Sequence, residues 1–250
     1  MTLAAALFLT VASARAEAPD ARDLIDRANR ALRGESSHCK LSMTIETPDW
    51  RRTLELEDWN KARDRALIVI RKPAKERGET TLRRDQEMWL WMPKVERVVK
   101  VPPTMMHSAW EGSDFTYEDI VKADSIVKDY THKVLSQAKE PGRTVYKIEA
   151  TPKPDAPVVW GKVVSEVALY EDGAVVPVRE EDYSERGELI RTIQLSQVKK
   201  MGGRLVPTRL ECDPASKKAQ RTVLVYHELD FDVPLKDSFF NYQRLQKAGD

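Results

Sequence analysis

Alternation between apolar and polar side chains runs through most of this chain and limits the folds that it can adopt. Segments with this period of two, which is typical of strands, cover residues 38–45, 52–59, 65–71, 80–84, 87–92, 95–101, 130–136, 143–151, 162–171, 175–184, 188–199, 204–211 and 219–231. Glycine or proline separates most of them, as at Pro141-Gly142 and Gly202-Gly203. Such a long series of strands with short connections predicts a single curved antiparallel sheet.

Two helices are expected, one at each end of the strand series. Residues 20–33 repeat apolar side chains with a helical period, with Asp20 as N-cap and Gly34 as the stop. Residues 237–245 predict a final short helix, with Asp237 as its cap.

The strand at residues 87–92 is apolar on both faces. Met88, Leu90 and Met92 alternate with Trp89 and Trp91, whereas a strand with one solvated face alternates apolar with polar residues. Both faces are therefore expected to be covered, one of them by helices or by a bound apolar molecule. A central strand in an ordinary β-sandwich is the other explanation.

The alternation is lost between residues 102 and 122. Within this interruption, Thr116 and Asp119 have the spacing of a capping box. A short helix is therefore expected to start near Tyr117.

The same interruption carries bulky apolar side chains, namely Met105, Met106, Trp110 and Phe115. Methionine is flexible and adapts to ligands of variable shape. A connection of this kind over a curved sheet is interpreted either as a movable lid or as a plug that completes the core.

Charge and composition exclude several classes of protein. The chain has 250 residues, of which 41 are Lys or Arg and 40 are Asp or Glu, so its net charge is +1. A nearly neutral chain is not expected to bind nucleic acid through the phosphate backbone. Two cysteines and four scattered histidines do not form a familiar zinc site.

The first sixteen residues have the features of a signal peptide. The apolar run at residues 3–12 is too short to span a bilayer, and Ala14-Arg15-Ala16 fits the small-x-small cleavage pattern. We therefore expect residues 1–16 to be removed and residues 17–250 to form a single exported domain, which in a double-membrane bacterium lies in the periplasm. A buried N-terminal helix is the alternative.

Export raises the question of a disulfide between Cys39 and Cys212, because oxidising compartments allow such bonds. Each cysteine lies in an alternating strand pattern, on the apolar face. Two buried free thiols are an equally good interpretation.

Known catalytic motifs are absent from the sequence, including the nucleophile elbow, the phosphate loop and the dinucleotide-binding fingerprint. Asp114, Glu118 and Asp119 form an acidic group, but helix capping explains Asp119 without catalysis. Ser113 and His107 lack the third member of a triad. No catalytic residue, metal ligand or cofactor is therefore assigned.

One segment, Gly-Ser-Asp-Phe-Thr-Tyr-Glu-Asp-Ile at residues 112–120, resembles a known family. Supporting matches lie at residues 88–93, 146–149, 152–154, 159–162 and 203–208. The family is that of the outer-membrane lipoprotein-sorting (LolA-like) proteins. The chain resembles a divergent branch that includes an uncharacterised treponemal lipoprotein domain.

The resemblance implies a mainly β fold, an unclosed antiparallel β-barrel with a few helices over its concave face. It also implies a carrier or chaperone that holds acyl chains in a hydrophobic cavity. The expected cavity lining is Leu41, Met43, Ile45, Met88, Leu90 and Met92. The expected lid residues are Met105, Met106, Trp110 and Phe115.

A carrier of this kind implies lipid or lipoprotein acyl chains as ligands, an inner-membrane ABC- or RND-type transporter as partner, and a monomeric state. One departure is Glu111, a carboxylate where related sequences often have an apolar residue. Two other interpretations remain open. One is a non-catalytic accessory subunit whose apolar face binds a protein, and the other is a lipid hydrolase with a site near His107 and Asp114.

Overall fold

The computed structural model describes residues 19–121 and 124–249. The predicted signal peptide, residues 1–16, lies outside the described residues. Within the two described ranges, no helix combines the length and the apolar character that crossing a membrane requires.

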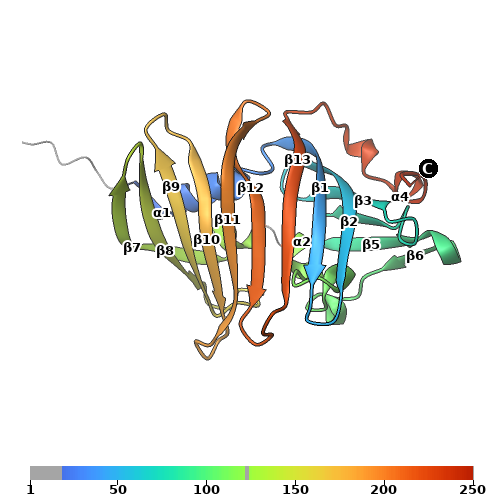
Figure 1. Ribbon diagram of the computed structural model, residues 1–250, viewed down its shortest axis with the longest axis horizontal. Helices are drawn as coiled ribbons and strands as arrows, with labels where there is room; N and C mark the ends of the chain where they lie inside the picture. Colours follow the sequence, from blue (N-terminus) through green and yellow to red (C-terminus); the bar gives the residue numbers. More distant parts are fainter. Residues whose placement is uncertain (1–18, 122–123, 250) are drawn as a thin grey trace, which may run out of the picture.

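The described chain forms one antiparallel sheet of 13 strands (Figure 1). The strands are β1 (Ser36–Glu46), β2 (Arg51–Lys61), β3 (Arg65–Lys72), β4 (Thr80–Arg84), β5 (Glu87–Met92), β6 (Arg97–Lys100), β7 (Tyr130–Glu140), β8 (Arg143–Pro152), β9 (Lys162–Tyr170), β10 (Val175–Tyr183), β11 (Leu189–Met201), β12 (Arg204–Pro214) and β13 (Arg221–Phe231). Every predicted strand is present. The one predicted at 95–101 is shortened to β6 because Pro93–Val95 forms a 3-10 turn, η1.

The order of the strands shows why the sheet is open. It runs β6-β5-β4-β3-β2-β1-β13-β12-β11-β10-β9-β8-β7, so that the last strand pairs with the first. The sheet thus has a first half, β1–β6, and a second half, β7–β13, joined by the β1–β13 pair. The edge strands β6 and β7 each have a single neighbour, so the barrel is unclosed, as predicted.

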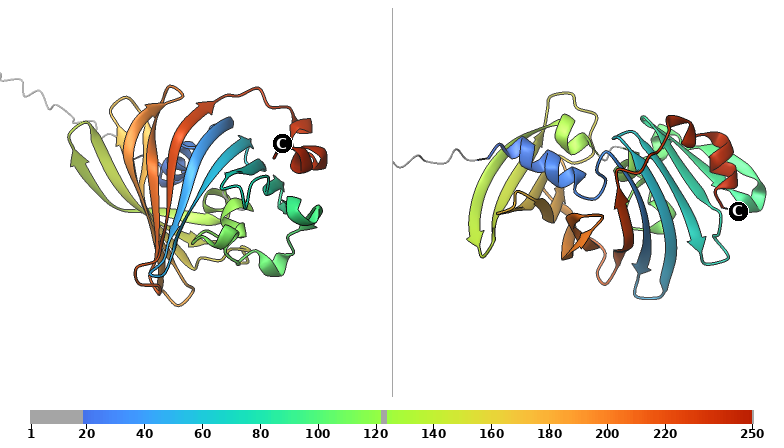
Figure 2. Two further views of the ribbon diagram at one scale, coloured as in Figure 1. Left: turned by 45° about the vertical axis from the view of Figure 1, so that its right-hand side comes forward. Right: turned by 90° about the horizontal axis from the view of Figure 1, so that it is seen from above.

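Short helices and turns pack on both faces of the sheet. Residues 21–30 and 110–121 lie on the inner face, whereas the C-terminal segment packs on the outer face of β3–β5. The helices and turns are α1 (Ala21–Arg30), η2 (Pro103–Met105), η3 (Trp110–Gly112), α2 (Tyr117–Val121), α3 (Ser125–Lys128), η4 (Asp237–Phe239) and α4 (Tyr242–Lys247). Helix α1 packs against β7, β9, β10 and α3, and Figure 2 shows the second half of the sheet curving around it.

Helix α1 begins where predicted and ends earlier. The Asp20 side chain caps it by accepting a hydrogen bond of 3.0 Å from the Arg22 backbone N–H. The helix ends at Arg30, and the residues predicted to continue it form a turn. That turn closes at Gly34, which has φ +58° and whose N–H donates to the Arg30 carbonyl.

The C-terminal helix also begins later than predicted. Its cap is Asn241, whose side chain accepts a 2.7 Å hydrogen bond from the Arg244 backbone N–H. Asp237 instead forms an ion pair with Lys61 on β2, so its carboxylate is not used as the cap of α4.

Both faces of β5 are covered, as its sequence predicts. Met88 and Leu90 pack on the inner face in the core that contains Trp110. Trp89 and Trp91 pack on the opposite face against Phe240 and other residues of the C-terminal segment. Other residues of the chain therefore cover both faces of β5.

Cys39 and Cys212 are buried free thiols and not a disulfide. They lie on β1 and β12, on either side of β13, opposite Leu229 and Thr222 respectively. Those two positions are seven residues apart on β13, which is about 23 Å along a strand. A disulfide requires Cα atoms within about 7 Å, so the fold rules out this bond.

We predict that the C-terminal segment contributes strongly to stability through Phe240, which is 1 % exposed. Phe240→Ala should lower the free energy of unfolding by about 3–5 kcal/mol, because it leaves a cavity between α4 and the outer face of β3–β5. Urea denaturation followed by circular dichroism measures this. The exposed Gln246→Ala, on the same helix, should change stability by less than about 0.5 kcal/mol. Equal effects of the two variants would contradict the role given to Phe240.

Candidate functional site

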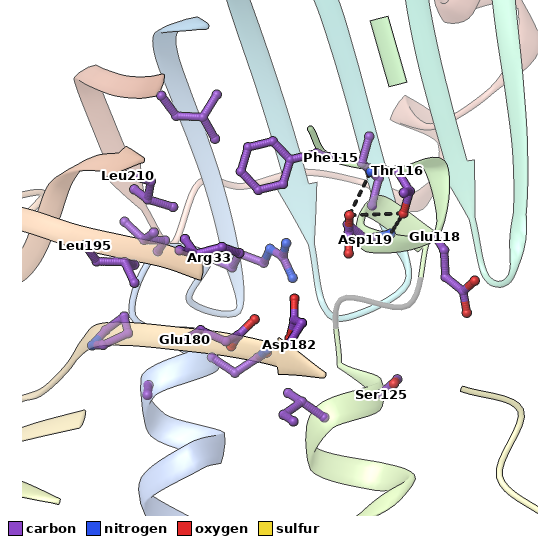
Figure 3. Close-up of a pocket in the computed structure, with 18 of the residues that line it drawn as sticks. Arg33, Phe115, Thr116, Glu118, Asp119, Ser125, Glu180, Asp182, Leu195 and Leu210 are labelled. Atoms are coloured by element: carbon purple, nitrogen blue, oxygen red, sulfur yellow. Dashed lines mark hydrogen bonds between the residues drawn. The ribbon is translucent and has the colours of Figure 1, made fainter. Parts of the chain in front are cut away.

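A cavity of about 450 Å³ lies on the inner face, between the two halves of the sheet and the segment that joins them. Its walls come from α1, from β1–β4 and β9–β13, and from residues 107–120 and 125–126. Figure 3 shows side chains of β10–β12, of the connecting segment and of Arg33 around it. The volume falls within the range typical of small-molecule sites.

The predicted lining residues occupy three different environments. Leu41 and Met43 on β1 line the cavity, as expected from their positions. Ile45 lies further along β1 and, with Met88 and Leu90, belongs to the adjoining core.

Met92 is a correction to the predicted lining, because it is 36 % exposed. It sits at the end of β5 beside the η1 turn, where β5 pairs only with the short edge strand β6 on one side. The covering segment does not extend over this end of the hairpin.

The four predicted lid residues also lie in different environments. Trp110 is 5 % exposed, and its indole N–H donates to Thr81 Oγ1 on β4 at 3.1 Å. Trp110 and Phe115 line the cavity, and Met106 packs against the core. Met105, in η2, is a correction, because it is 45 % exposed and does not line the cavity.

The segment that resembles the lipoprotein-sorting family is bound tightly to β13. Asp114 accepts hydrogen bonds from Thr222 Oγ1 at 2.7 Å and from Gln220 Nε2 at 2.6 Å. Ser113 Oγ donates to the Trp110 carbonyl at 2.7 Å. These polar side chains therefore hold the segment in place.

The predicted capping box at the start of α2 is confirmed. Asp119 Oδ2 accepts from the Thr116 backbone N–H at 2.7 Å, and Thr116 Oγ1 accepts from the Asp119 N–H at 3.3 Å. Helix α2 starts at Tyr117. Asp119 has a second role that sequence alone did not reveal.

Arg191 on β11 joins α2 to the second half of the sheet. Its guanidinium donates two hydrogen bonds of 2.7 Å to the two carboxylate oxygens of Asp119. Its Nε donates to Asp182 Oδ2 on β10 at 2.6 Å. The guanidinium also lies 4.8 Å from the ring of Trp160 and 5.8 Å from that of Phe115. We call Arg191, Asp119 and Asp182 the Arg191 network, in which Arg191 and Asp182 are buried and Asp119 is partly buried.

Arg83 on β4 holds the other end of α2. Its guanidinium donates to the Ile120 carbonyl at 3.0 Å and to the Arg63 carbonyl at 2.5 Å. The alternating pattern predicts that basic residues on the strands face solvent. Arg83 does not, because it is only 6 % exposed. Helix α2 is thus tied to both halves of the sheet by buried arginines.

Three acidic side chains around Arg191 have displaced pKa values. Burial raises the pKa of Glu180 to about 8, and the nearby charge of Asp182 adds to the effect. Burial also raises the pKa of Asp182, although Arg191 acts in the opposite direction. For Asp119, burial is outweighed by the hydrogen bonds and charge of Arg191, so its pKa is lowered.

The residues considered for a hydrolase site each interact with a different partner. His107 Nδ1 lies 2.9 Å from Glu118 Oε2, Asp114 binds Thr222, and Ser113 binds a backbone carbonyl. Among the residues that the structure describes, no three His, Cys, Asp or Glu side chains gather as a metal site.

Three solved structures share this arrangement of sheet and helices. A DUF1329 family protein from Desulfovibrio piger has a TM-score of 0.79 at 23 % identity, covering 90 % of this chain and 98 % of that chain. A LolA superfamily protein from Nitrosomonas europaea has a TM-score of 0.74 at 22 % identity, covering 90 % and 99 %. An outer membrane lipoprotein-sorting protein domain from Vibrio parahaemolyticus has a TM-score of 0.75 at 19 % identity, covering 91 % and 98 %.

The fold is therefore that of the LolA superfamily, as the sequence resemblance implied. A family model described as an uncharacterized protein matches residues 62–247, and the chain belongs to that family. A search of curated proteins found no match.

We predict that Arg191→Met lowers the free energy of unfolding by about 3–5 kcal/mol, because it leaves Asp119 and Asp182 buried without their partner. Thermal and urea denaturation measure this. Arg179→Met, which breaks a part-exposed pair with Glu181 on neighbouring β10, should cost less than about 1 kcal/mol. Equal losses of stability in the two variants would contradict a large contribution of the Arg191 network to the free energy of unfolding.

Glu180 predicts a pH dependence of stability. Its pKa is about 8 in the folded protein against an ordinary value of 4.5, so between those values the folded state holds a proton that the unfolded state has released. Stability from this group is therefore full below about pH 4.5 and is lost as the pH rises through 8. Glu180→Gln should flatten the decline by up to about 1.4 kcal/mol per pH unit.

The control for this measurement is Glu181→Gln, on the adjacent position of β10. The pKa of Glu181 is lowered by its hydrogen bond with Arg179, so this variant should leave the slope between pH 5 and 8 unchanged. Urea denaturation at several pH values gives both slopes. A wild-type protein with constant stability over this interval would contradict the protonation state assigned to Glu180.

Proposed function

We propose that this protein is a periplasmic carrier or chaperone that holds the acyl chains of a lipid or lipoprotein in the cavity on its inner face. The observation that carries the proposal is an apolar wall that no core cluster of the described residues includes. Leu195 on β11 and Leu210 on β12 are opposite each other, line the cavity and are only partly buried (Figure 3).

Burial of an acyl chain supplies enough free energy for such a carrier. Each methylene group removed from water contributes about 0.8 kcal/mol, so a sixteen-carbon chain gains on the order of 10 kcal/mol when fully buried. A protein that extracts lipid from a membrane must come close to this value and must also release its cargo.

Helix α2 and the residues before it are the part of the protein suited to control release. They cover the cavity, and they are tied to the sheet by polar contacts with Arg83 and Arg191. Polar ties of this kind can be exchanged for contacts with water or with a partner when the cover opens. We propose that the protein acts as a monomer beside an inner-membrane transporter of the ABC or RND type.

A second function, that of a non-catalytic accessory subunit, is favoured by the edge strand β6. Val98 and Val99 on β6 and Val95 just before it are exposed large apolar residues. An unpaired strand edge with such side chains can accept a strand or an apolar surface from another protein. In this alternative the transport system binds the edge, and the cavity carries no cargo.

We predict that Leu195→Glu abolishes lipid retention while the protein remains folded, because it places a carboxylate on the apolar wall. The matched control is Leu189→Glu on the same strand, where the side chain is 40 % exposed and outside the cavity. Gentle native mass spectrometry of protein purified from the periplasm, followed by solvent extraction, measures retention. Lipid retention by both variants would favour the accessory subunit. So would a wild-type protein that shows only the apoprotein mass when excess lipid is offered.

A further inference from the structure

One basic and one acidic side chain line the cavity without a hydrogen-bond partner in residues 19–121 and 124–249. Arg33, just after α1, and Glu180 on β10 both project into it (Figure 3). Neither side chain makes a hydrogen bond or an ion pair with the residues that the structure describes. A polar or charged group inside a protein is costly when it lacks a hydrogen-bond partner, so these two groups are available to a ligand.

Asp182 supplies a second free acceptor beside Glu180. The two residues are two positions apart on β10 and therefore point to the same face. Asp182 is 1 % exposed, and its Oδ2 is bound by Arg191, but its Oδ1 is buried without a hydrogen bond. The donors of Arg191 are already directed to Asp119, Asp182 and the Asp114 carbonyl.

The charges around these acceptors favour a cation. Asp119 and Asp182 share the guanidinium of Arg191, and Glu180 adds a third carboxyl group beside it, so negative charge is in excess at this end of the cavity once Glu180 is ionised. Arg179 does not restore the balance, because its guanidinium binds Glu181 and Gln194. An ammonium group would supply both the missing positive charge and the hydrogen-bond donors.

The apolar wall formed by Leu195 and Leu210 adjoins these polar groups in the same cavity (Figure 3). We propose that the cavity binds a zwitterionic amphiphile: its apolar chain lies on this wall, its ammonium group binds Glu180 and Asp182, and its anionic group binds Arg33. This inference rests on the proposed carrier function and adds a preference for one class of headgroup to it.

The test is a competition between two phospholipids with identical acyl chains. Delipidated protein is incubated with mixed vesicles of equal phosphatidylethanolamine and phosphatidylglycerol content, and the bound lipid is identified by native mass spectrometry. Both lipids carry a phosphate, but only the first carries an ammonium group. A measurement at pH 8.5 keeps Glu180 ionised, since its pKa is about 8.

The wild type should retain phosphatidylethanolamine over phosphatidylglycerol by about tenfold, which corresponds to about 1.4 kcal/mol. Glu180→Gln should lose this preference and still bind lipid, whereas the matched Glu181→Gln should keep it. Arg33→Gln should weaken retention of both lipids by about tenfold, because both contribute a phosphate. Neither substitution breaks a hydrogen bond or an ion pair among the described residues, so the variants should fold.

Two results separate the failure of this inference from that of the carrier function. Retention of both lipids in equal amounts, or a preference for phosphatidylglycerol, would overturn the headgroup site and leave the carrier function standing. Retention of neither lipid by the wild type would contradict the carrier function itself, and the headgroup site with it.

Discussion

The Arg191 network is the interaction on which the shape of the cavity depends. The sheet is held together along its strands, but its two edges, β6 and β7, do not meet, so backbone pairing alone does not define a closed interior. Arg191 links β10 and β11 to α2 through buried ion pairs, and Arg83 fixes the other end of that helix to β4. Because a buried charge deprived of its partner is strongly destabilising, the closed arrangement is well defined as long as all members are present.

The inner and outer faces of the sheet are covered to different extents by the rest of the chain. On the outer side of β3–β5 the C-terminal segment provides a complete apolar cover, with Phe240 and Leu245 fully buried. On the inner side the cover is incomplete, and the apolar wall at Leu195 and Leu210 remains open to the cavity. Native cores are close-packed, so an open apolar wall beside polar groups without partners among the described residues supports the proposed ligand.

Sequence patterns predicted the strands and the start of α2 well, because period-two alternation and the capping box at Thr116 and Asp119 are local signals. They could not place Cys39 relative to Cys212, since strand β13 comes last in the chain and inserts between them. Nor did they find Arg191, Asp182, Glu180 and Arg33, because alternation assigns charged residues to the solvated face. The one available signal was the acidic run at residues 180–182 within a strand, because successive residues of a strand point to opposite faces and cannot all face solvent.

The central claim, that an acyl chain occupies the cavity on the inner face, is tested most directly by photo-cross-linking. A phospholipid with a photoreactive group at the end of one acyl chain is loaded onto the full protein, irradiated, and the modified peptides are mapped by mass spectrometry. The carrier account predicts modification of β11 and β12 at the wall that contains Leu195 and Leu210. Modification confined to the exposed edge at Val98 and Val99 would contradict it.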